Sequence, residues 1–387
     1  MVKSGANTPR GWSNGGGWPT LCLLENVTRH PSRPWLTAAC TNHDGEAGAV
    51  LLFDWERGQL IYTHQHEESV GWLGSHDVLR WHPDGTRLGT TASTNGILVL
   101  EEGRPSGEAL PDDGRDSGVS YVWVDDRLYT DTDMLIDPTR DEYATPPPPY
   151  PLVGGPEWNS VDGFSWNPRL RAAVADTLDH GIAAFSPETG SVHWRIAPSD
   201  RARTHISPDG RHVLRLTWQP GETSEVAWFD GDTGASIATH QSDLGVPSVS
   251  WGPAGQLALY TRTSSGPWLV ELHDPNGRRA RWHSEERITG SDLDLPAVSW
   301  SPDGTRLAVT VERGVVLLDA ATAQLVGRLP VLLPEPTIRS PEYDSSRGGS
   351  VWWVADDTLL RIEQHAVAVW SADGSRRSDF VMPTSGG

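Results

Sequence analysis

The chain has 387 residues and a formal net charge of −20, with 51 acidic against 31 basic side chains. This excess of negative charge repels phosphate groups, so it disfavours general binding to nucleic acid or to anionic membranes. Hydrophobic residues make up 37%, enough for a buried core, while 40 glycines and 30 prolines predict many short elements joined by turns. The composition therefore favours an all-β fold.

The first 17 residues are polar and rich in glycine, and we expect them to be flexible. They lack the apolar core of a secretory signal, and no later run is apolar enough to cross a membrane. These features predict a cytoplasmic protein in which residues 18–387 form a single domain. Two cysteines, Cys22 and Cys40, are too few for a disulfide scaffold or a four-cysteine zinc site, and we interpret them as small buried hydrophobes.

The first predicted unit has strands near 21–24, 35–40, 49–53 and 60–63. Its last strand leads into His64 and His66, whose side chains point to the same side of a strand because they are two residues apart. With Glu67, His76 and Asp77 close in sequence, this pair is a candidate site for a divalent metal. A histidine pair on an exposed edge strand, with no metal, is the alternative.

A repeated motif follows, with copies that read VLRWHPDGTRLGTTAS (78–93), YVWVDDRLYTDT (121–132), FSWNPRLRAAVAD (164–176), THISPDGRHVLRLT (204–217), VSWGPAGQLALYT (249–261), VSWSPDGTRLAVT (298–310) and VWWVADDTLLRI (351–362). They are anchored at Trp81, Trp123, Trp166, Ile206, Trp251, Trp300 and Trp353. The spacing of about 40 to 50 residues is typical of four-stranded propeller blades.

Each copy has the same internal order. A strand ends near the anchor, a Pro-Asp-Gly turn follows, and the glycine supplies a positive φ. The second strand, as in 306–311, alternates in polarity, whereas the third, as in 315–318, is almost wholly apolar and is expected to be buried on both faces. A second turn such as FDGDTG (229–234) leads to a polar fourth strand. Counting the first unit gives eight blades, with seven as the alternative because the unit at 123–144 is short.

This pattern resembles the WD40-type and the related bacterial TolB-like and YVTN-like β-propellers from about Trp18 onward. Where that family carries Trp-Asp, this chain has Phe53-Asp54, Phe229-Asp230, His273-Asp274, Leu318-Asp319 and Trp370-Ser371. The resemblance implies an all-β propeller of four-stranded antiparallel blades. The Gly-His dipeptide of WD40 units is missing, so the family's Asp-His-Ser/Thr-Trp hydrogen-bond network is not expected here.

The tryptophan anchors are predicted to pack between blades, because an aromatic residue at a fixed place in every unit serves packing. The connections differ between the two ends of the strands. On the turn side, the first-to-second and third-to-fourth strand turns are tight. On the long-loop side, the remaining connections include the irregular segments 63–77, 101–118, 144–162, 283–296 and 330–349.

Long loops on a rigid scaffold usually carry recognition residues, so we expect the long-loop side to bind a partner. Its acidic and aromatic side chains suit a basic peptide, an arginine-bearing protein surface or a cationic small molecule. The predicted contact residues are Trp72, Tyr150, Trp158, Trp268, Tyr343, Glu67, Glu68, Asp292 and Asp294.

Candidates for chemistry are few. Asp176, Asp179 and His180 lie in one short segment, as acid/base groups, metal ligands or polar turn formers. Segments 130–133 and 291–295 offer carboxylates for calcium without completing an EF-hand. The sequence has no nucleophile elbow, phosphate loop or HExxH motif, and it predicts no cofactor.

We therefore expect a non-catalytic scaffold that binds a protein or peptide through its long-loop side. The alternative is an enzyme or small-molecule binder at the mouth of the central channel, with a metal at His64 and His66 or at Asp176 and His180. A third hypothesis is a structural domain that serves a neighbouring enzyme. The sequence predicts no catalytic residue and no oligomeric state.

Overall fold

The computed structural model describes residues 23–41, 48–66, 79–90, 96–101, 104–105, 121–124, 127–130, 135–136, 161–177, 181–186, 189, 191–199, 202–218, 223–245, 247–261, 268–288, 297–330, 350–363 and 366–381. The chain divides into two compact units. The first comprises Met1–Val119, Ile362–Val367 and Ser378–Gly387, and the second Ser120–Arg361 and Ala368–Arg377. Among the described residues no helix is long and apolar enough to cross a membrane.

The first unit contains two antiparallel sheets with strands in chain order. One sheet consists of β1 (Leu23–Arg29), β2 (Trp35–Thr41), β3 (Gly48–Asp54) and β4 (Gln59–His66). The other consists of β5 (Leu79–Trp81), β6 (Arg87–Thr90), β7 (Gly96–Glu101) and β8 (Arg104–Pro105). The four predicted strands of the first unit overlap β1 to β4; the first extends further than expected, to Arg29, and its predicted beginning at residues 21–22 lies outside the described residues.

The second unit continues the pattern with a three-stranded sheet of β9 (Tyr121–Val124), β10 (Arg127–Thr130) and β11 (Leu135–Ile136). Three four-stranded sheets follow: β12 (Val161–Asn167), β13 (Ala172–Thr177), β14 (Gly181–Phe185) and β15 (Val192–Ile196); β16 (Ala202–Ile206), β17 (His212–Trp218), β18 (Ser224–Asp230) and β19 (Ser236–Ser242); and β20 (Pro247–Trp251), β21 (Leu257–Thr261), β22 (Trp268–Asp274) and β23 (Gly277–Ser284).

The last two sheets complete the series along the chain. They comprise β24 (Val298–Trp300), β25 (Arg306–Val311), β26 (Gly314–Asp319) and β27 (Leu325–Pro330), and then β28 (Ser350–Ala355), β29 (Thr358–Glu363), β30 (Ala366–Ser371) and β31 (Arg376–Val381). The described residues thus form eight sheets, seven of them four-stranded. The prediction of an all-β chain of four-stranded antiparallel blades is confirmed.

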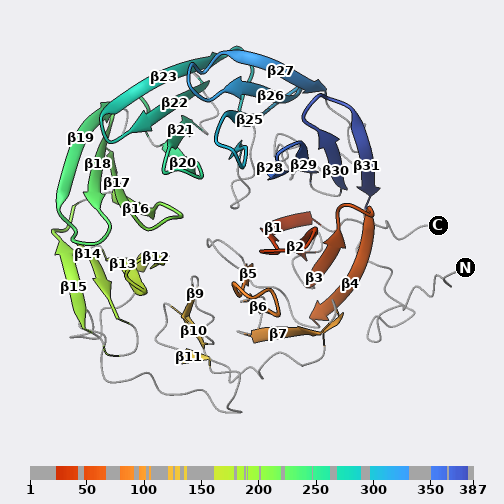
Figure 1. Ribbon diagram of the computed structural model, residues 1–387, viewed down its shortest axis with the longest axis horizontal. Coiled ribbons are helices and arrows are strands. Elements are labelled where there is room, and N and C mark those ends of the chain that lie inside the picture. Colours follow the sequence, from red (N-terminus) through yellow and green to blue (C-terminus); the bar gives the residue numbers. More distant parts are fainter. Residues whose placement is uncertain are drawn as a thin grey trace, which may run out of the picture. The chain divides into compact units, whose positions relative to one another are not determined.

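In the second unit, consecutive sheets pack face to face. Their first strands contact one another, as β12 does β16 and β24 does β28, and the outer strands β19 and β23 also touch. Figure 1 shows the first strands β16, β20 and β24 on the inner side of this series and β19, β23 and β27 on its outer side. This is the radial arrangement of propeller blades.

Burial follows from this stacking, because the third strand of a sheet is covered by a neighbouring sheet on either side. Every residue of β14 is buried, and so are all residues of β26 except its last. The second strand β25 was expected to have unlike faces, but Thr310 is 0% exposed and Leu307 to Val311 are all buried. Its polar position faces a neighbouring sheet rather than water, so the alternation does not mark an exposed face.

The tryptophan anchors pack as predicted in most sheets. Trp81, Trp123, Trp300 and Trp353 are buried, whereas Trp166 and Trp251 are half-buried. Trp300 belongs to a cluster that joins Leu272 and Val270 of one sheet to Leu307 and Val309 of the next. Four further apolar clusters each join two consecutive sheets among the described residues, and three of them contain a tryptophan anchor, so these anchors pack between sheets.

The turns between first and second strands share one geometry. At Gly85, Gly210, Gly255 and Gly304 the backbone N–H donates to the carbonyl three residues earlier, at 2.8–3.1 Å. All four glycines have φ between +70° and +76°, a region that suits residues without a Cβ. The Pro-Asp-Gly prediction is thereby confirmed, including the glycine's positive φ.

Replacing Trp300 with alanine tests the role of the anchors. The indole is 7% exposed, and its Nε1–H donates to the Ser250 carbonyl at 3.1 Å. Loss of this side chain leaves a cavity between two sheets, so we expect Trp300→Ala to lower the free energy of unfolding by about 3 to 5 kcal/mol. Denaturant unfolding followed by circular dichroism measures this change.

The matched control is Leu325→Ala on outer strand β27, where the side chain is 55% exposed. We expect that substitution to change stability by about 0.5 kcal/mol or less. Equal losses for the two variants would contradict the role assigned to the anchor.

Candidate functional site

Most of the predicted partner-binding residues lie outside the described residues. These are Trp72, Tyr150, Trp158, Tyr343, Glu67, Glu68, Asp292 and Asp294. Trp268 is described: it is the first residue of β22, is half-buried, and packs against the apolar cluster that contains Trp300. Part of the Trp268 ring is therefore buried by core packing, and its role in partner binding stays a prediction.

The metal candidates are only partly placed. His64 and His66 lie on outer strand β4, where they pair with Val50 and Gly48 of β3. His180 lies outside the described residues, as do residues 131–133 and 291–295, where calcium was considered. Within the described ranges no group of three or more His, Cys, Asp or Glu side chains is arranged to hold a metal ion.

Asp176 differs from its predicted setting. It lies within β13 rather than in the following loop, and its carboxylate is 8% exposed. The hydroxyl of Thr204, on β16 of the next sheet, donates to it. A buried carboxylate in this position links two sheets, so the geometry favours a structural role over acid/base chemistry.

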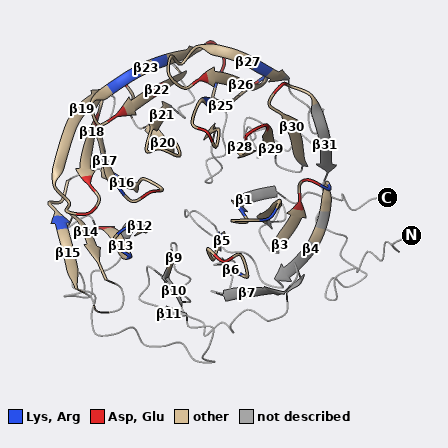
Figure 2. Ribbon diagram, in the orientation of Figure 1, with Lys and Arg blue, Asp and Glu red and all other residues tan. Residues whose placement is uncertain are grey.

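The turn side carries a regular pattern of aspartates. Asp54, Asp230, Asp274 and Asp319 each end the third strand of a sheet, and Figure 2 shows a red end on β3, β18, β22 and β26. Each carboxylate accepts backbone N–H groups of the turn that follows, as Asp230 does from Asp232 and Thr233 at 3.2 and 2.9 Å. These residues occupy the places of the Trp-Asp dipeptides, and they act as turn caps.

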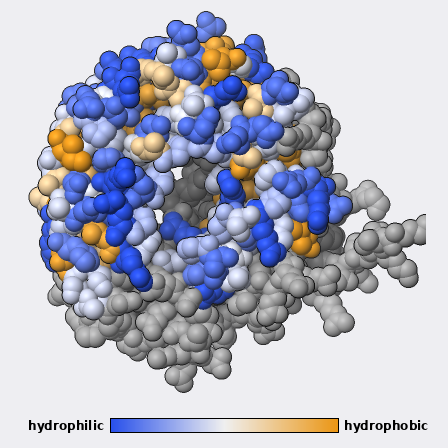
Figure 3. All heavy atoms as spheres, in the orientation of Figure 1, coloured by the Kyte–Doolittle hydropathy of each residue, from blue (hydrophilic) through white to orange (hydrophobic). Residues whose placement is uncertain are grey.

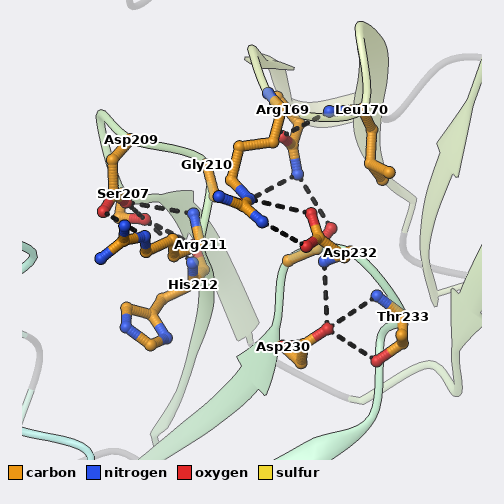
Figure 4. A network of polar contacts seen from close by, with 12 residues as sticks. Arg169, Leu170, Ser207, Asp209, Gly210, Arg211, His212, Asp230, Asp232 and Thr233 are labelled. Carbon is orange, nitrogen blue, oxygen red and sulfur yellow. Dashed lines mark hydrogen bonds and ion pairs between the residues drawn. The ribbon is translucent and has the colours of Figure 1, made fainter.

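Five described aspartates on the turn side have an arginine beside them. Figure 4 shows the most extended case, where Arg169 donates to both carboxylate oxygens of Asp232 at 3.0 and 2.7 Å. The same pairing occurs between Asp54 and Arg57 (3.6 Å), Asp84 and Arg87 (3.2 Å), Asp209 and Arg211 (3.5 Å), and Asp274 and Arg279 (3.3 Å). At these turns the negative charge of the aspartate is balanced by a neighbouring arginine.

A pocket between the last two sheets departs from this balance. It has a volume of about 520 Å³ and opens between the turns at 301–306, 356–357 and 371–373. Its lining includes four aspartates but one arginine, Arg306, with the buried Trp353 among the remaining residues: Ser301, Asp303, Thr305, Asp356, Asp357, Ser371, Ala372 and Asp373. The lining of this pocket is therefore strongly acidic.

Serine and threonine, rather than arginine, hold two of these carboxylates. Asp303 accepts from the Ser301 hydroxyl at 2.6 Å and from the Thr305 N–H at 3.0 Å. The Ser371 hydroxyl donates to Asp373 and lowers the pKa of that carboxyl to about 2, and the Ser301 bond lowers the pKa of Asp303. Neutral donors satisfy the oxygens without cancelling their charge, so both groups stay negative at neutral pH and suit a cationic side chain.

A second charged cluster lies between sheets β16–β19 and β20–β23. Glu271 is 0% exposed and accepts from Arg278 at 3.0 Å, from Arg281 at 2.6 Å, from the Ser242 hydroxyl at 2.7 Å and from His273 at 3.1 Å. Asp243 accepts from the same two arginines. Every oxygen of Glu271 is engaged within the protein, so this cluster joins two sheets and offers nothing to a ligand.

Sequence reasoning missed both clusters. The turn-side pocket combines residues from three separate turns, at 301–306, 356–357 and 371–373, each of which has the sequence of an ordinary turn. Glu271 sits in an apolar strand, WLVELHD, where a single acid surrounded by hydrophobes was the available signal. A buried acid in such a strand requires partners, and three arginines follow within ten residues, of which Arg278 and Arg281 donate to Glu271.

The hydropathy of the visible face is consistent with these observations. Figure 3 shows mainly hydrophilic residues with small, separate hydrophobic patches on the described part. The exposed large hydrophobics among described residues are Ile61, Ile237, Leu325 and Val326. Scattered residues of this kind are normal for a folded domain and do not mark a large apolar interface.

No family model matches the chain, and no curated protein matches it either. Solved structures share its fold. The Dos1 propeller is 12% identical, with 95% of this chain and 97% of that chain covered and a TM-score of 0.62. The computationally designed Ika8 protein is 12% identical (95% and 98% covered, TM-score 0.53). Atg21, in a complex with the coiled coil of Atg16, is 10% identical (93% and 100% covered, TM-score 0.51). At these identities the likeness concerns the fold alone, and the predicted β-propeller is confirmed.

Glu271→Gln tests whether the buried cluster stabilises the fold. Burial raises the pKa of Glu271, but the bonds from His273, Ser242, Arg281 and Arg278 outweigh it and lower the pKa to about 2. Its contribution is therefore complete above the ordinary value of 4.5 and is lost as pH falls from there toward 2. We expect the variant to lose about 3 kcal/mol at pH 7, measured by urea unfolding, and the difference from wild type to shrink at pH 3.

Asp243→Asn is the control, because that side chain is 53% exposed and contacts the same arginines. A loss of about 1 kcal/mol or less is expected there. A Glu271→Gln effect of equal size at both pH values would show that its ionisation is not what stabilises the junction.

Proposed function

We propose that this propeller is a non-catalytic binding platform for a protein or peptide with a basic surface. The carrying observation is the turn-side pocket, where four aspartates, one arginine and Trp353 surround a hollow of about 520 Å³. Ionised carboxylates beside an indole suit an arginine or lysine side chain, because the cation pairs with the acids and its alkyl stem packs on apolar surface. A cytoplasmic location and a WD40-type origin stay parts of this proposal.

Two further observations support a binding role. Among the described residues, polar side chains outside the pocket cap turns, as Asp230 does, or link neighbouring sheets, as Glu271 does. The structure of Atg21, which shares the fold, is a complex with the coiled coil of Atg16, so a propeller of this fold binds a protein in at least that case. The alternative of an enzyme or small-molecule binder at the channel mouth keeps its basis in the sequence alone.

The long-loop side is the second surface of this proposal. Its candidate contacts, among them Trp72, Trp158 and Tyr343, combine aromatic rings with nearby acids in the sequence. The two sides lie at opposite ends of the strands, so variants of one leave the other intact. A partner is expected to depend on one of them more than on the other.

The pocket is tested with an arginine-rich nonapeptide and its glutamate-rich counterpart as fluorescent probes. We expect the wild-type chain to bind the arginine-rich peptide and not the glutamate-rich one. The triple variant Asp303→Asn, Asp356→Asn, Asp373→Asn should bind the arginine-rich peptide at least tenfold more weakly than the wild type. Binding should also weaken as salt is raised from 50 to 300 mM, because screening acts on exposed charges.

Removing three charges elsewhere on the turn side provides the matched control. Asp209→Asn, Asp274→Asn, Asp319→Asn changes the net charge equally but leaves the pocket lining intact. If this control weakens peptide binding as much as the pocket variant, attraction is due to overall charge and the pocket has no specific role.

The long-loop side is tested by affinity capture from a lysate of the native host, with mass spectrometry as readout. Replacing Trp72, Trp158 and Tyr343 with alanine should abolish capture of a partner that uses this side, while the circular dichroism of the chain stays unchanged. A partner retained by this variant but lost by the pocket variant would assign binding to the turn side. Capture unaffected by either variant would contradict the proposal.

A further inference from the structure

The first sheet has no Pro-Asp-Gly motif, yet its first turn is closed by the same backbone hydrogen bond as the first turn of the second sheet. His30 precedes Pro31, and its N–H donates to the Trp35 carbonyl at 3.0 Å, as His82 does to the Arg87 carbonyl at 2.8 Å. The residue before proline is therefore equivalent in both turns. At His30 this position carries a ring that is 1% exposed.

Every nitrogen of this ring has a partner. Nδ1 accepts the N–H groups of Ser32 and Arg33 at 3.1 and 2.9 Å, and Nε2 lies 2.9 Å from the carbonyl oxygen of Gly85 in the next sheet. Nδ1 must be unprotonated to accept two donors, so the proton resides on Nε2 and is donated to Gly85. The neutral ring thus joins the β1–β2 turn to the β5–β6 turn.

Asn167 occupies the same position in the sheet β12–β15. Its Oδ1 accepts the N–H groups of Arg169 and Leu170 at 3.0 and 3.2 Å, and its Nδ2 donates to the Gly210 carbonyl of the next sheet at 3.1 Å. The glycine fits as closely in both places, because a Cβ on Gly85 would lie 2.4 Å from the His30 ring and one on Gly210 2.4 Å from Asn167. Asn167 Nδ2 also donates to the Gly231 carbonyl at 2.9 Å, a bond that His30 does not have. The other three bonds are the same for the amide and the imidazole, but only the imidazole titrates.

We propose that His30 is an acid-sensitive latch between the first two sheets, and that Asn167 is the pH-insensitive form of the same latch. When Nδ1 takes up a proton it ceases to accept, and two backbone donors in the β1–β2 turn lose their acceptor. The buried imidazolium also faces those donors. Acidification therefore weakens the hold of this turn on Gly85.

The surroundings favour the neutral ring. Burial lowers the pKa of His30 most, the Gly85 bond opposes this, and Arg33 on the same turn adds to the lowering. Asp84 on the β5–β6 turn acts in the opposite direction, but its charge is shared with His82 (2.8 Å) and Arg87 (3.2 Å). Trp35 and Trp81 enclose the ring, with centroids 5.1 and 4.5 Å away. Because the folded pKa lies below the ordinary 6.5, the latch is complete above that value and weakens as pH falls through it.

Hydrogen exchange of the full chain, measured by mass spectrometry from pH 7.5 to 5.0 and corrected for intrinsic rates, tests the latch. In the wild type, protection of residues 82–87 should fall by up to about tenfold per pH unit below 6.5. In His30→Asn the same segment should keep its protection at every pH. Residues 207–212, beside Asn167, should stay protected in both proteins.

The converse variant, Asn167→His, should bring the acid-dependent loss to residues 207–212 and leave 82–87 as in the wild type. The proposal is overturned if wild-type residues 82–87 show no such loss, or if His30→Asn loses protection as steeply as the wild type. Should His30→Asn fail to fold, Asn167→His decides: unchanged protection at 207–212 on acidification would overturn the latch.

Discussion

The structure depends on the burial of both faces of each sheet against its neighbours. In β17, Val213 joins the apolar cluster shared with the preceding sheet, and the adjacent Leu214 joins the one shared with the following sheet. In β25 the same division separates Leu307 from Ala308. Successive side chains of a strand point to opposite faces, so β17 and β25 are each covered by a neighbouring sheet on both sides. A single sheet of this kind is not stable alone, and each one depends on the next.

Polar groups that lie between sheets are tolerated only where partners are built in. Glu271 is fully buried beside two arginines, and Asp176 has the Thr204 hydroxyl. Each such group holds two sheets in a particular register, since an apolar contact permits sliding whereas a buried carboxylate must meet its donors. The carboxylates of the turn-side pocket differ because they line a hollow. We therefore propose the pocket as a recognition surface, whereas Glu271 and Asp176 link neighbouring sheets.

Much of the fold follows from the sequence because its signals are local and repeated. The Pro-Asp-Gly turns, the apolar third strands and the tryptophan anchors each recur at fixed places, so every copy supports the others. Exposure was less predictable: Thr310 reads as a solvent-facing position but is covered by the next sheet. The candidate site was harder still, because Asp303, Asp356 and Asp373 come from three separate turns and meet only after the sheets pack. The predicted long-loop contacts remain predictions; among them Trp268 lies in the described part of the chain, where its half-buried ring packs on the core.

The residue before the turn proline also bears on how such a chain can change by duplication. Ser207 and Ser301 accept N–H groups of their own turns, from His212 and Arg306, and both are too short to reach a neighbouring glycine. A unit with serine there carries its turn chemistry within itself, so it can be copied or exchanged without loss of a bond. The units that begin with His30 and Asn167 lack this independence, because each requires a glycine of the following unit. These two units therefore cannot be placed before any other unit: the unit that follows must carry a turn with a glycine where Gly85 and Gly210 stand.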